Sequence, residues 1–220
     1  MGMGLIEVFL CWWRRDVLLQ RTHFEGLEQI AQLRKQNQAI ILLTGHFTTL
    51  EVGGTLINTH FPIAAMQREQ SNELFSEIML RSRMRNLDRV VNRNAIRELT
   101  KYLKQGGIAW YAPDQNYNGP HSVFAEFFEV PAATTSATSR LARMTGAVVV
   151  PFYQVRDSNS HTYRVIIGKP LAGIPSNDIV EDTRVANRAI EAMVRQAPDQ
   201  YLWSHRRFKN LPERYGNLYE

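Results

Sequence analysis

The chain has 220 residues, 44% of them hydrophobic, which is enough to bury a sizeable core as a single domain over 1–220. Its one cysteine, Cys11, excludes a disulfide within the chain and agrees with a reducing compartment. The formal net charge of +5 favours anionic partners, which include nucleic acid, phosphorylated lipid, an acidic carrier protein and a membrane surface. No secretory signal is evident, and no apolar run reaches the ~20 residues that a membrane-spanning helix needs.

Residues 1–20 are predicted to be helical and unusually apolar for a surface segment. Trp12 and Trp13 stand directly before Arg14 and Arg15, a pattern typical of a helix that lies in a membrane interface. The alternative is a core helix whose tryptophans fill volume. Because the chain opens abruptly at Met-Gly-Met-Gly, we expect that an upstream part is missing.

An amphipathic helix is predicted over 24–35, and it leads into an apolar, β-branched run at 39–44. Gly45 ends this run and Thr48-Thr49 follows, so we predict a buried strand, a tight turn and a helix over 48–58. His46 would then lie at the carboxyl end of a strand, the edge at which α/β sheets bind ligands.

His46 and Glu51 are the candidate catalytic pair. An imidazole can take a proton from a hydroxyl near neutral pH, and a carboxylate on its other nitrogen fixes the tautomer. Two simpler interpretations stay open at this point. Thr48 and Glu51 also fit a capping box, and a histidine after a strand is commonly a hydrogen-bonded turn residue.

The middle of the chain brings further polar groups to strand ends. A short strand over 62–66 is followed by Arg68, and a helix over 71–86 ends in arginines at 81, 83 and 85, which also suit a helix C-terminus. A strand at 90–91 and a helix over 94–105 come next. The strand over 108–112 then carries Asp114 and Gln115 to the same sheet edge as His46.

The remaining elements complete an α/β pattern. The long segment 113–133 is predicted to be a functional or mobile loop whose aromatic residues line a groove or pin it to the core. A helix over 134–144, a strand over 147–153 with a hairpin partner at 163–167, and a helix over 178–197 follow. We therefore predict an α/β fold in which helices flank a mixed, mostly parallel sheet.

The chain resembles the secondary, or late, acyltransferases of lipid A, the lauroyl and myristoyl transferases of lipopolysaccharide biosynthesis in the wider glycerolipid acyltransferase superfamily. The resemblance covers nearly the whole chain. Six blocks carry it in the right order: 44–51, 81–85, 110–115, 123–135, 141–146 with 150–152, and 201–209. Two departures are the missing membrane-anchoring segment and Glu129, where the family often has glycine.

The resemblance implies that a fatty acyl chain of lauroyl type moves from acyl carrier protein to a hydroxyl of an acyl chain on a Kdo-bearing lipid A precursor. It implies a cytoplasmic-face inner-membrane location, an anionic membrane surface as partner and no cofactor or metal. By similarity, His46 and Glu51 are the catalytic dyad, while Arg83 and Asp114 match other implicated positions. Arg68 and Gln115 are further candidates for substrate binding or orientation.

Two functions of other classes remain as alternatives. A basic domain with interleaved aromatic residues is compatible with a module that binds single-stranded nucleic acid without catalysis, although its Lys and Arg residues are spread among acids. A metal-dependent hydrolase would need a third ligand beside His46 and Glu51, and the sequence offers none at a recognised spacing.

Overall fold

The computed structural model describes residues 2–67, 72–157, 159–212, 215–216 and 218–219. The helices are α1 (Gly2–Trp13), α2 (Arg15–Leu19), α3 (Leu27–Lys35), α4 (Leu50–Ile57), α5 (Glu73–Asn86), α6 (Ile96–Lys104), α7 (Ala137–Thr145), α8 (Ile179–Gln196) and the 3-10 turn η1 (Pro198–Gln200). The strands are β1 (Thr22–Glu25), β2 (Ile40–Leu43), β3 (Ala64–Gln67), β4 (Arg89–Asn92), β5 (Ile108–Tyr111), β6 (Ser122–Phe127), β7 (Val130–Thr135), β8 (Val148–Asp157) and β9 (Thr162–Ile167).

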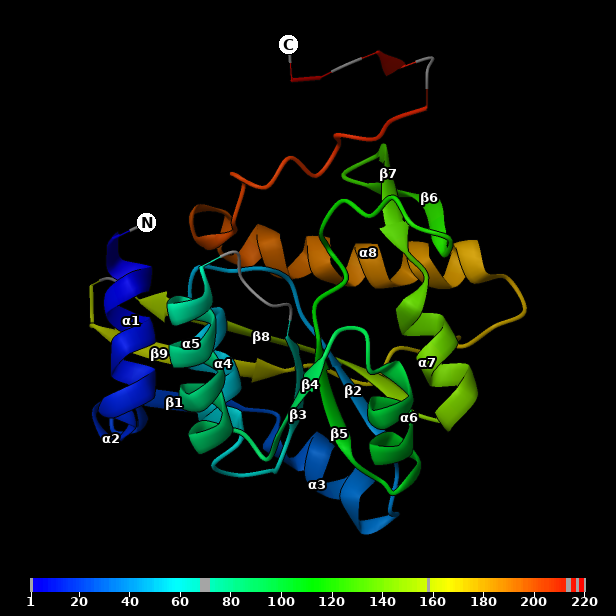
Figure 1. Cartoon of the computed structure of the whole chain (residues 1–220). Coiled ribbons are helices and arrows are strands. Elements are labelled where there is room, and N and C mark those ends of the chain that lie inside the picture. Colours follow the sequence, from blue (N-terminus) through cyan, green and yellow to red (C-terminus); the bar gives the residue numbers. More distant parts are fainter. Residues whose placement is uncertain (1, 68–71, 158, 213–214, 217, 220) are drawn as a thin grey trace.

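Seven strands of the described ranges form one sheet in the order β1-β9-β8-β2-β5-β3-β4 (Figure 1). Neighbouring strands are parallel except for the β8–β9 hairpin, which is antiparallel. The predicted α/β class, with a mixed and mostly parallel sheet between helices, is therefore confirmed. The predicted pairing of 147–153 with 163–167 is confirmed as well.

The central strand β2 explains why its sequence is apolar throughout. Ile41 and Leu43 face a core that contains residues of α6, α7 and α8, whereas Ile40 and Leu42 face a second core that contains residues of α1, α2, α3, α4 and α5. A strand buried on both faces reads as a continuous hydrophobic run. The sheet is thus covered on both sides, and its edges are where polar groups reach solvent.

Gly54 shows why a helix covering the sheet carries small residues. A Cβ at this position would lie 2.5 Å from the ring of Trp110 on β5, which is closer than side chains tolerate. Gly53 is in the same situation with the side chain of Gln154 on β8. These glycines therefore let α4 approach side chains of the sheet closely.

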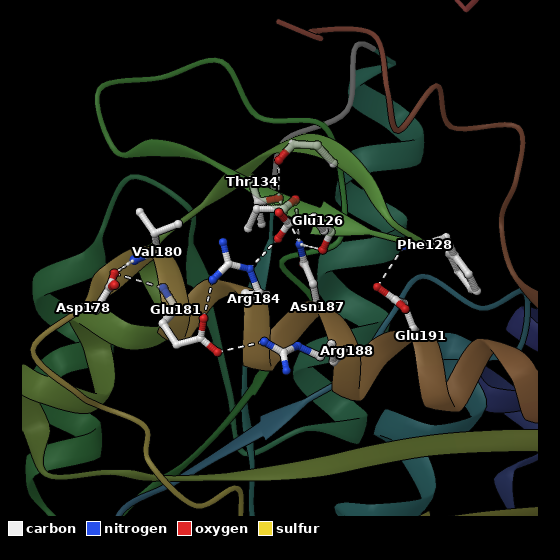
Figure 2. A network of polar contacts seen from close by, with 12 residues as sticks. Glu126, Phe128, Thr134, Asp178, Val180, Glu181, Arg184, Asn187, Arg188 and Glu191 are labelled. Carbon is white, nitrogen blue, oxygen red and sulfur yellow. Dashed lines mark hydrogen bonds and ion pairs between the residues drawn. The ribbon is translucent and has the colours of Figure 1, made fainter. Parts of the chain in front are cut away.

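A two-stranded hairpin, β6–β7, lies inside the segment that the sequence analysis treats as a loop. Figure 2 shows how α8 fixes this hairpin: Asn187 donates to the carbonyl of Glu126 at 3.0 Å, and Glu191 accepts from the amide of Phe128 at 2.8 Å. Arg184 also pairs with Glu126. The aromatic residues of this segment differ in their burial: Phe127 is fully buried and anchors the hairpin to the core, while Phe124 is 49% exposed.

The N-terminal segment is two helices, α1 and α2, rather than one. Trp12 is buried, so the core interpretation holds for it, whereas Trp13 is 56% exposed and the membrane-interface interpretation stays a prediction. Glu7, the one charge in the apolar run, is buried and accepts hydrogen bonds from Arg156 at 2.6 and 2.8 Å. Among the described residues, none of the helices is both long enough and apolar enough to cross a bilayer.

Two further boundaries differ from the predictions. Residues 22–25 form β1, which pairs with β9, so the helix predicted to begin at Phe24 begins instead at Leu27. The helix predicted to begin at 134 begins at Ala137, because Thr134 and Thr135 belong to β7. In both places a run without clear periodicity joins a sheet, through the distant strand β9 for 22–25 and through the neighbouring strand β6 for Thr134 and Thr135.

Candidate active site

His46 and Asp114 come together because of the register of two neighbouring strands. β2 and β5 are parallel and pair Leu43 with Tyr111. His46 and Asp114 each lie three residues beyond these paired positions, at the carboxyl edge of the sheet. The prediction that the two strand ends present their polar groups together is confirmed.

The Asp114 carboxylate is the hydrogen-bond partner of the imidazole. Nδ1 of His46 donates to Oδ1 of Asp114 at 2.5 Å, and the backbone amide of His46 donates to Oδ2 at 2.7 Å. The hydroxyl of Tyr201 also donates to Oδ2, at 2.8 Å. The side chain of Asp114 is 1% exposed and that of His46 is 26% exposed. Nε2 is thus the ring nitrogen left for a substrate.

The charges of this pair support each other. Burial acts to lower the pKa of His46, but the charge and hydrogen bond of Asp114 outweigh it, so the pKa lies above its usual value. Burial acts to raise the pKa of Asp114, and the contacts with His46 and Tyr201 outweigh it in turn, so that pKa is lowered. Asp114 therefore stays ionised and makes the neutral imidazole of His46 a stronger base.

Glu51 does not hold the imidazole, which corrects the expected role. Its carboxylate pairs with the guanidinium of Arg83 on α5, and Nε of Arg83 lies 3.1 Å from its Oε1. The reason is geometric: Phe47–Thr49 form a turn before α4 begins, and Glu51 on the first turn of that helix meets α5. The capping box is not formed either, since the N-cap residue of α4 is Thr49 and it makes no side-chain cap hydrogen bond.

The Glu51–Arg83 pair nevertheless borders the histidine. Both side chains are about one-seventh exposed, at 15% and 14%, and Arg83 also donates to Oε1 of Gln67 at 3.3 Å. The positive charge of Arg83 acts to lower the pKa of His46, against the stronger effect of Asp114. The hydrogen bonds of Asp114 go to His46 and Tyr201 and not to Arg83.

The remaining predicted site residues do not contact the His46–Asp114 pair among the interactions of the described residues. Gln115 is exposed and its carbonyl accepts from Arg207 at 3.4 Å, while Arg68 lies outside the described residues. Arg207 is 4% exposed and donates to the carbonyl of Ala133 at 2.8 Å, so its guanidinium is enclosed by the protein. Arg206 does reach the surface.

Sequence reasoning missed Gln67, Tyr201 and His205 as parts of the site. Nε2 of His205 accepts from the amide of Asn116 at 3.0 Å, and burial followed by the charge of His46 lowers the pKa of His205. Each of these residues comes from a segment remote from 44–51 in sequence. The available signal was that polar residues follow the ends of neighbouring strands, and it applied only to Gln67, the last residue of β3.

Within the ranges that the structure describes, no group of three or more His, Cys, Asp or Glu side chains is arranged to hold a metal ion. What the site does present is a histidine with one nitrogen held by a buried carboxylate and the other directed to a sheet edge. A histidine held in this way is of the kind that serves as a general base toward a hydroxyl group in enzymes.

The sequence matches the family described as "Bacterial lipid A biosynthesis acyltransferase" over residues 1–210, and the chain belongs to this family. It is 36% identical to the lipid A biosynthesis lauroyltransferase of Escherichia coli (strain K12), with 99% of this chain and 72% of the relative aligned. It is 34% identical to the palmitoleoyltransferase of the same organism, over 100% of this chain and 72% of that protein.

Among solved structures, the 1-acyl-sn-glycerophosphate acyltransferase PlsC from Thermotoga maritima matches 91% of this chain and 89% of its own. That match has a TM-score of 0.45 and 14% sequence identity.

Proposed function

We propose that this chain transfers a lauroyl-type fatty acyl group from acyl carrier protein to a hydroxyl of an acyl chain on a Kdo-bearing lipid A precursor. The observation that carries the proposal is the His46–Asp114 pair, in which Nδ1 is engaged at 2.5 Å and Nε2 is available. Membership of the acyltransferase family supports the reaction class. The lauroyl type is supported by the relative at 36% identity, beside a palmitoleoyltransferase at 34%.

In the proposed step, Nε2 of His46 takes the proton of the acceptor hydroxyl while the hydroxyl oxygen attacks the thioester carbonyl. The carbon–sulfur bond of the tetrahedral intermediate then breaks, and the imidazolium returns the proton to the departing thiolate. A positioned base of this kind contributes ~10²–10⁴-fold in rate. No covalent acyl-enzyme is needed, and the buried thiol of Cys11 takes no part.

The developing oxyanion needs hydrogen-bond donors. We assign this role to amides of the first turn of α4, because Thr49 does not cap that helix with its side chain. The amides of Thr48, Leu50 and Gly53 are excluded, since they already donate to the carbonyls of Gln200 at 2.8 Å, Phe47 at 3.0 Å and Thr49 at 3.2 Å.

Arg83 is proposed to bind a phosphate of the acceptor, because a guanidinium matches the geometry of phosphate oxygens. Glu51 then acts on catalysis through Arg83, whose side chain it holds beside His46. Gln115, exposed directly after Asp114, is proposed to help orient the acceptor. Arg68 remains a prediction for the same role.

An apolar surface over α1 and α5 is proposed to rest on the anionic inner membrane at its cytoplasmic face. Its exposed members are Met3, Leu5, Ile6, Phe9 and Trp13 on α1, and Leu74, Phe75 and Ile78 on α5. The two helices lie side by side (Figure 1), and Trp12 meets Phe75 with ring centroids 6.5 Å apart. An exposed apolar patch bordered by Arg14 and Arg15 suits an anionic interface.

The direct test is a mass spectrum of the lipid product. The chain is incubated with lauroyl-loaded acyl carrier protein and a Kdo-bearing, phosphorylated precursor, beside lauroyl-coenzyme A as a second donor and His46→Ala as the control enzyme. We expect one added lauroyl group with the carrier protein and none with the variant. Absence of product with either donor, or equal product from His46→Ala, would overturn the proposal.

A further inference from the structure

Residues 200–202, near the C-terminal end of the chain, are paired to the loop that carries His46. The amide of Thr48 donates to the carbonyl of Gln200 at 2.8 Å, and the amide of Leu202 donates to the carbonyl of His46 at 2.9 Å. Phe47 and Tyr201 form an isolated antiparallel bridge between these two bonds. The backbone of Tyr201 is therefore fixed relative to that of His46.

The side chain of Tyr201 is fixed as firmly as its backbone. It is 7% exposed, and its ring lies against Phe47, with centroids 5.6 Å apart, and against Trp203, with centroids 4.9 Å apart. Its hydroxyl donates to Oδ2 of Asp114 at 2.8 Å. Burial and then the Asp114 carboxylate raise the pKa of Tyr201, so the phenol keeps its proton and remains a donor.

We propose that Tyr201 is a positioning residue for acyl transfer, which holds Asp114 so that its Oδ1 faces His46. The proposal rests on the proposed function, in which His46 is the base. Tyr201 acts through Asp114 and does not touch the substrate.

The chemistry of the shared carboxylate explains the role. Oδ2 receives two hydrogen bonds, from Tyr201 and from the amide of His46, which restrict rotation of the carboxylate. A phenol donor also takes up part of the negative charge. Without the Tyr201 hydroxyl, Asp114 binds the imidazole proton more tightly, which raises the pKa of His46. His46 is then neutral, and able to act as a base, over a narrower range of pH.

Other ionisable side chains lie around the His46–Asp114 pair. Arg83 acts on His46 from α5, and Arg207 acts on Asp114 and Tyr201 from the C-terminal segment. His205 and Tyr111 are further titratable groups beside the pair; burial is the first cause of the lowered pKa of His205 and of the raised pKa of Tyr111. None of these groups bonds to the hydroxyl of Tyr201, so its removal acts on Asp114 first.

The test is Tyr201→Phe, with Tyr163→Phe as a matched control. Tyr163 is also 7% exposed, and its hydroxyl also donates to a buried carboxylate at 2.8 Å, that of Glu7. The two variants thus lose the same atom from the same kind of bond in different regions. Thermal unfolding of both establishes that each is folded.

For Tyr201→Phe we expect kcat to fall roughly tenfold, as for loss of one hydrogen bond to a charged group, while KM for the lipid acceptor is unchanged. The acid limb of the kcat/KM profile should move to higher pH. For Tyr163→Phe we expect kcat, KM and the pH profile of the parent. If Tyr201→Phe matches the parent in both kcat and pH profile, the proposal is overturned.

A second measurement separates this proposal from the proposed function. The His46 imidazole is titrated by NMR in protein labelled with ¹⁵N-histidine, and its signals are identified by their loss in His46→Gln. We expect Tyr201→Phe to raise the titration midpoint of His46 and Tyr163→Phe to leave it in place. If the His46 midpoint shifts in Tyr201→Phe but the parent protein transfers no acyl group, the proposed function is contradicted while the effect of Tyr201 on His46 is supported. If the midpoint does not shift, the positioning role is contradicted.

Discussion

Asp114 and Glu7 are two buried carboxylates that are alike in most respects. They are 1% and 2% exposed, and each accepts a hydrogen bond of 2.8 Å from a tyrosine hydroxyl. They differ in the remaining partner, which is a histidine for Asp114 and an arginine for Glu7. Asp114 lies at the carboxyl edge of the sheet, and Glu7 joins α1 to Arg156 on β8.

The partner decides what the carboxylate does. A histidine gains and loses a proton near neutral pH, so the Asp114 cluster can take part in proton transfer. An arginine keeps its charge at any working pH, and the hydrogen bond with Glu7 raises the pKa of Arg156 further. The Glu7 cluster is therefore a fixed attachment of the N-terminal helix, although its geometry is as good as that of the active site.

The largest effect is expected on activity when the titrating partner is removed. His46→Ala should lower kcat by ~10²–10⁴-fold, because the general base is lost, while the thermal midpoint stays close to that of the parent. The measurement is acyl transfer under saturating donor. His60→Ala, at an exposed histidine after α4, is the control and should retain full activity. A similar loss in both variants would contradict the assignment.

The next largest effect is expected on stability when Arg156 loses its buried counter-charge, Glu7. Glu7→Gln should lower the free energy of unfolding by about 3 kcal/mol, because Arg156 then lacks a counter-charge in a buried position. Activity per folded molecule should not change. The measurement is denaturant unfolding followed by fluorescence.

The control for Glu7→Gln is Glu25→Gln, which breaks a pair with Arg164 of similar length, 2.7 Å, at an exposed position. Water screens such a pair, so its loss should cost less than about 1 kcal/mol. If both substitutions cost the same, burial does not distinguish the two pairs, and the Glu7 cluster is no special attachment.

The pH dependence separates the two regions in another way. Because the pKa of His46 is raised, its neutral form appears only above the ordinary value of about 6.5, and kcat/KM should rise with pH through that region. Asp114→Asn removes the carboxylate that raises this pKa, so the acid limb should move to lower pH while the maximal rate falls. An unmoved limb would show that another group titrates.

The stability that the His46–Asp114 pair contributes has the opposite trend. The part from His46 is complete below the unfolded pKa of about 6.5 and is lost as pH rises through the raised folded pKa. The part from Asp114 is present above its unfolded pKa and is lost as pH falls through the lowered folded pKa. Unfolding midpoints across pH should therefore show this pair contributing most between about pH 4 and 6.5, below the range of highest activity.

The smallest effect concerns an acidic residue whose backbone matters more than its carboxylate. Glu129 is exposed and has a φ of +65°, next to Phe128 at +50°, in the turn between β6 and β7. Glu129→Gly should stabilise the protein by roughly 0.5–1 kcal/mol, since glycine removes the cost of the left-handed backbone but loses more entropy on folding. Glu129→Ala, which keeps the strained φ, should not stabilise it.

The fold was most predictable where a strand is a continuous apolar run because it is buried on both faces. The runs at 39–44 and 108–112 predicted β2 and β5 and brought His46 and Asp114 to one edge. The pairing of Glu51 with Arg83 could not be predicted, because the direction of a side chain after a three-residue turn depends on which helix packs beside it. β1 and the β6–β7 hairpin were missed, because their strands are defined by pairing rather than by periodicity.

Tyr201 was beyond prediction for a related reason. Its hydroxyl reaches Asp114 across 87 residues of chain, and only the bridge with Phe47 places it there. The pattern around 201–209 was visible as a block, but a block does not say which atom of the site it meets. Contacts between segments distant in sequence are therefore where the coordinates add most.

The bridge between Phe47 and Tyr201 also bears on the order in which the protein is made. Synthesis delivers His46 early and Asp114 midway, but the phenol that secures the carboxylate leaves the ribosome more than 150 positions after the histidine. A nascent chain that already contains the residues of the sheet still lacks the hydrogen bond from Tyr201 to Asp114. The arrangement proposed for His46 and Asp114 is therefore complete only after residue 201 has been synthesised.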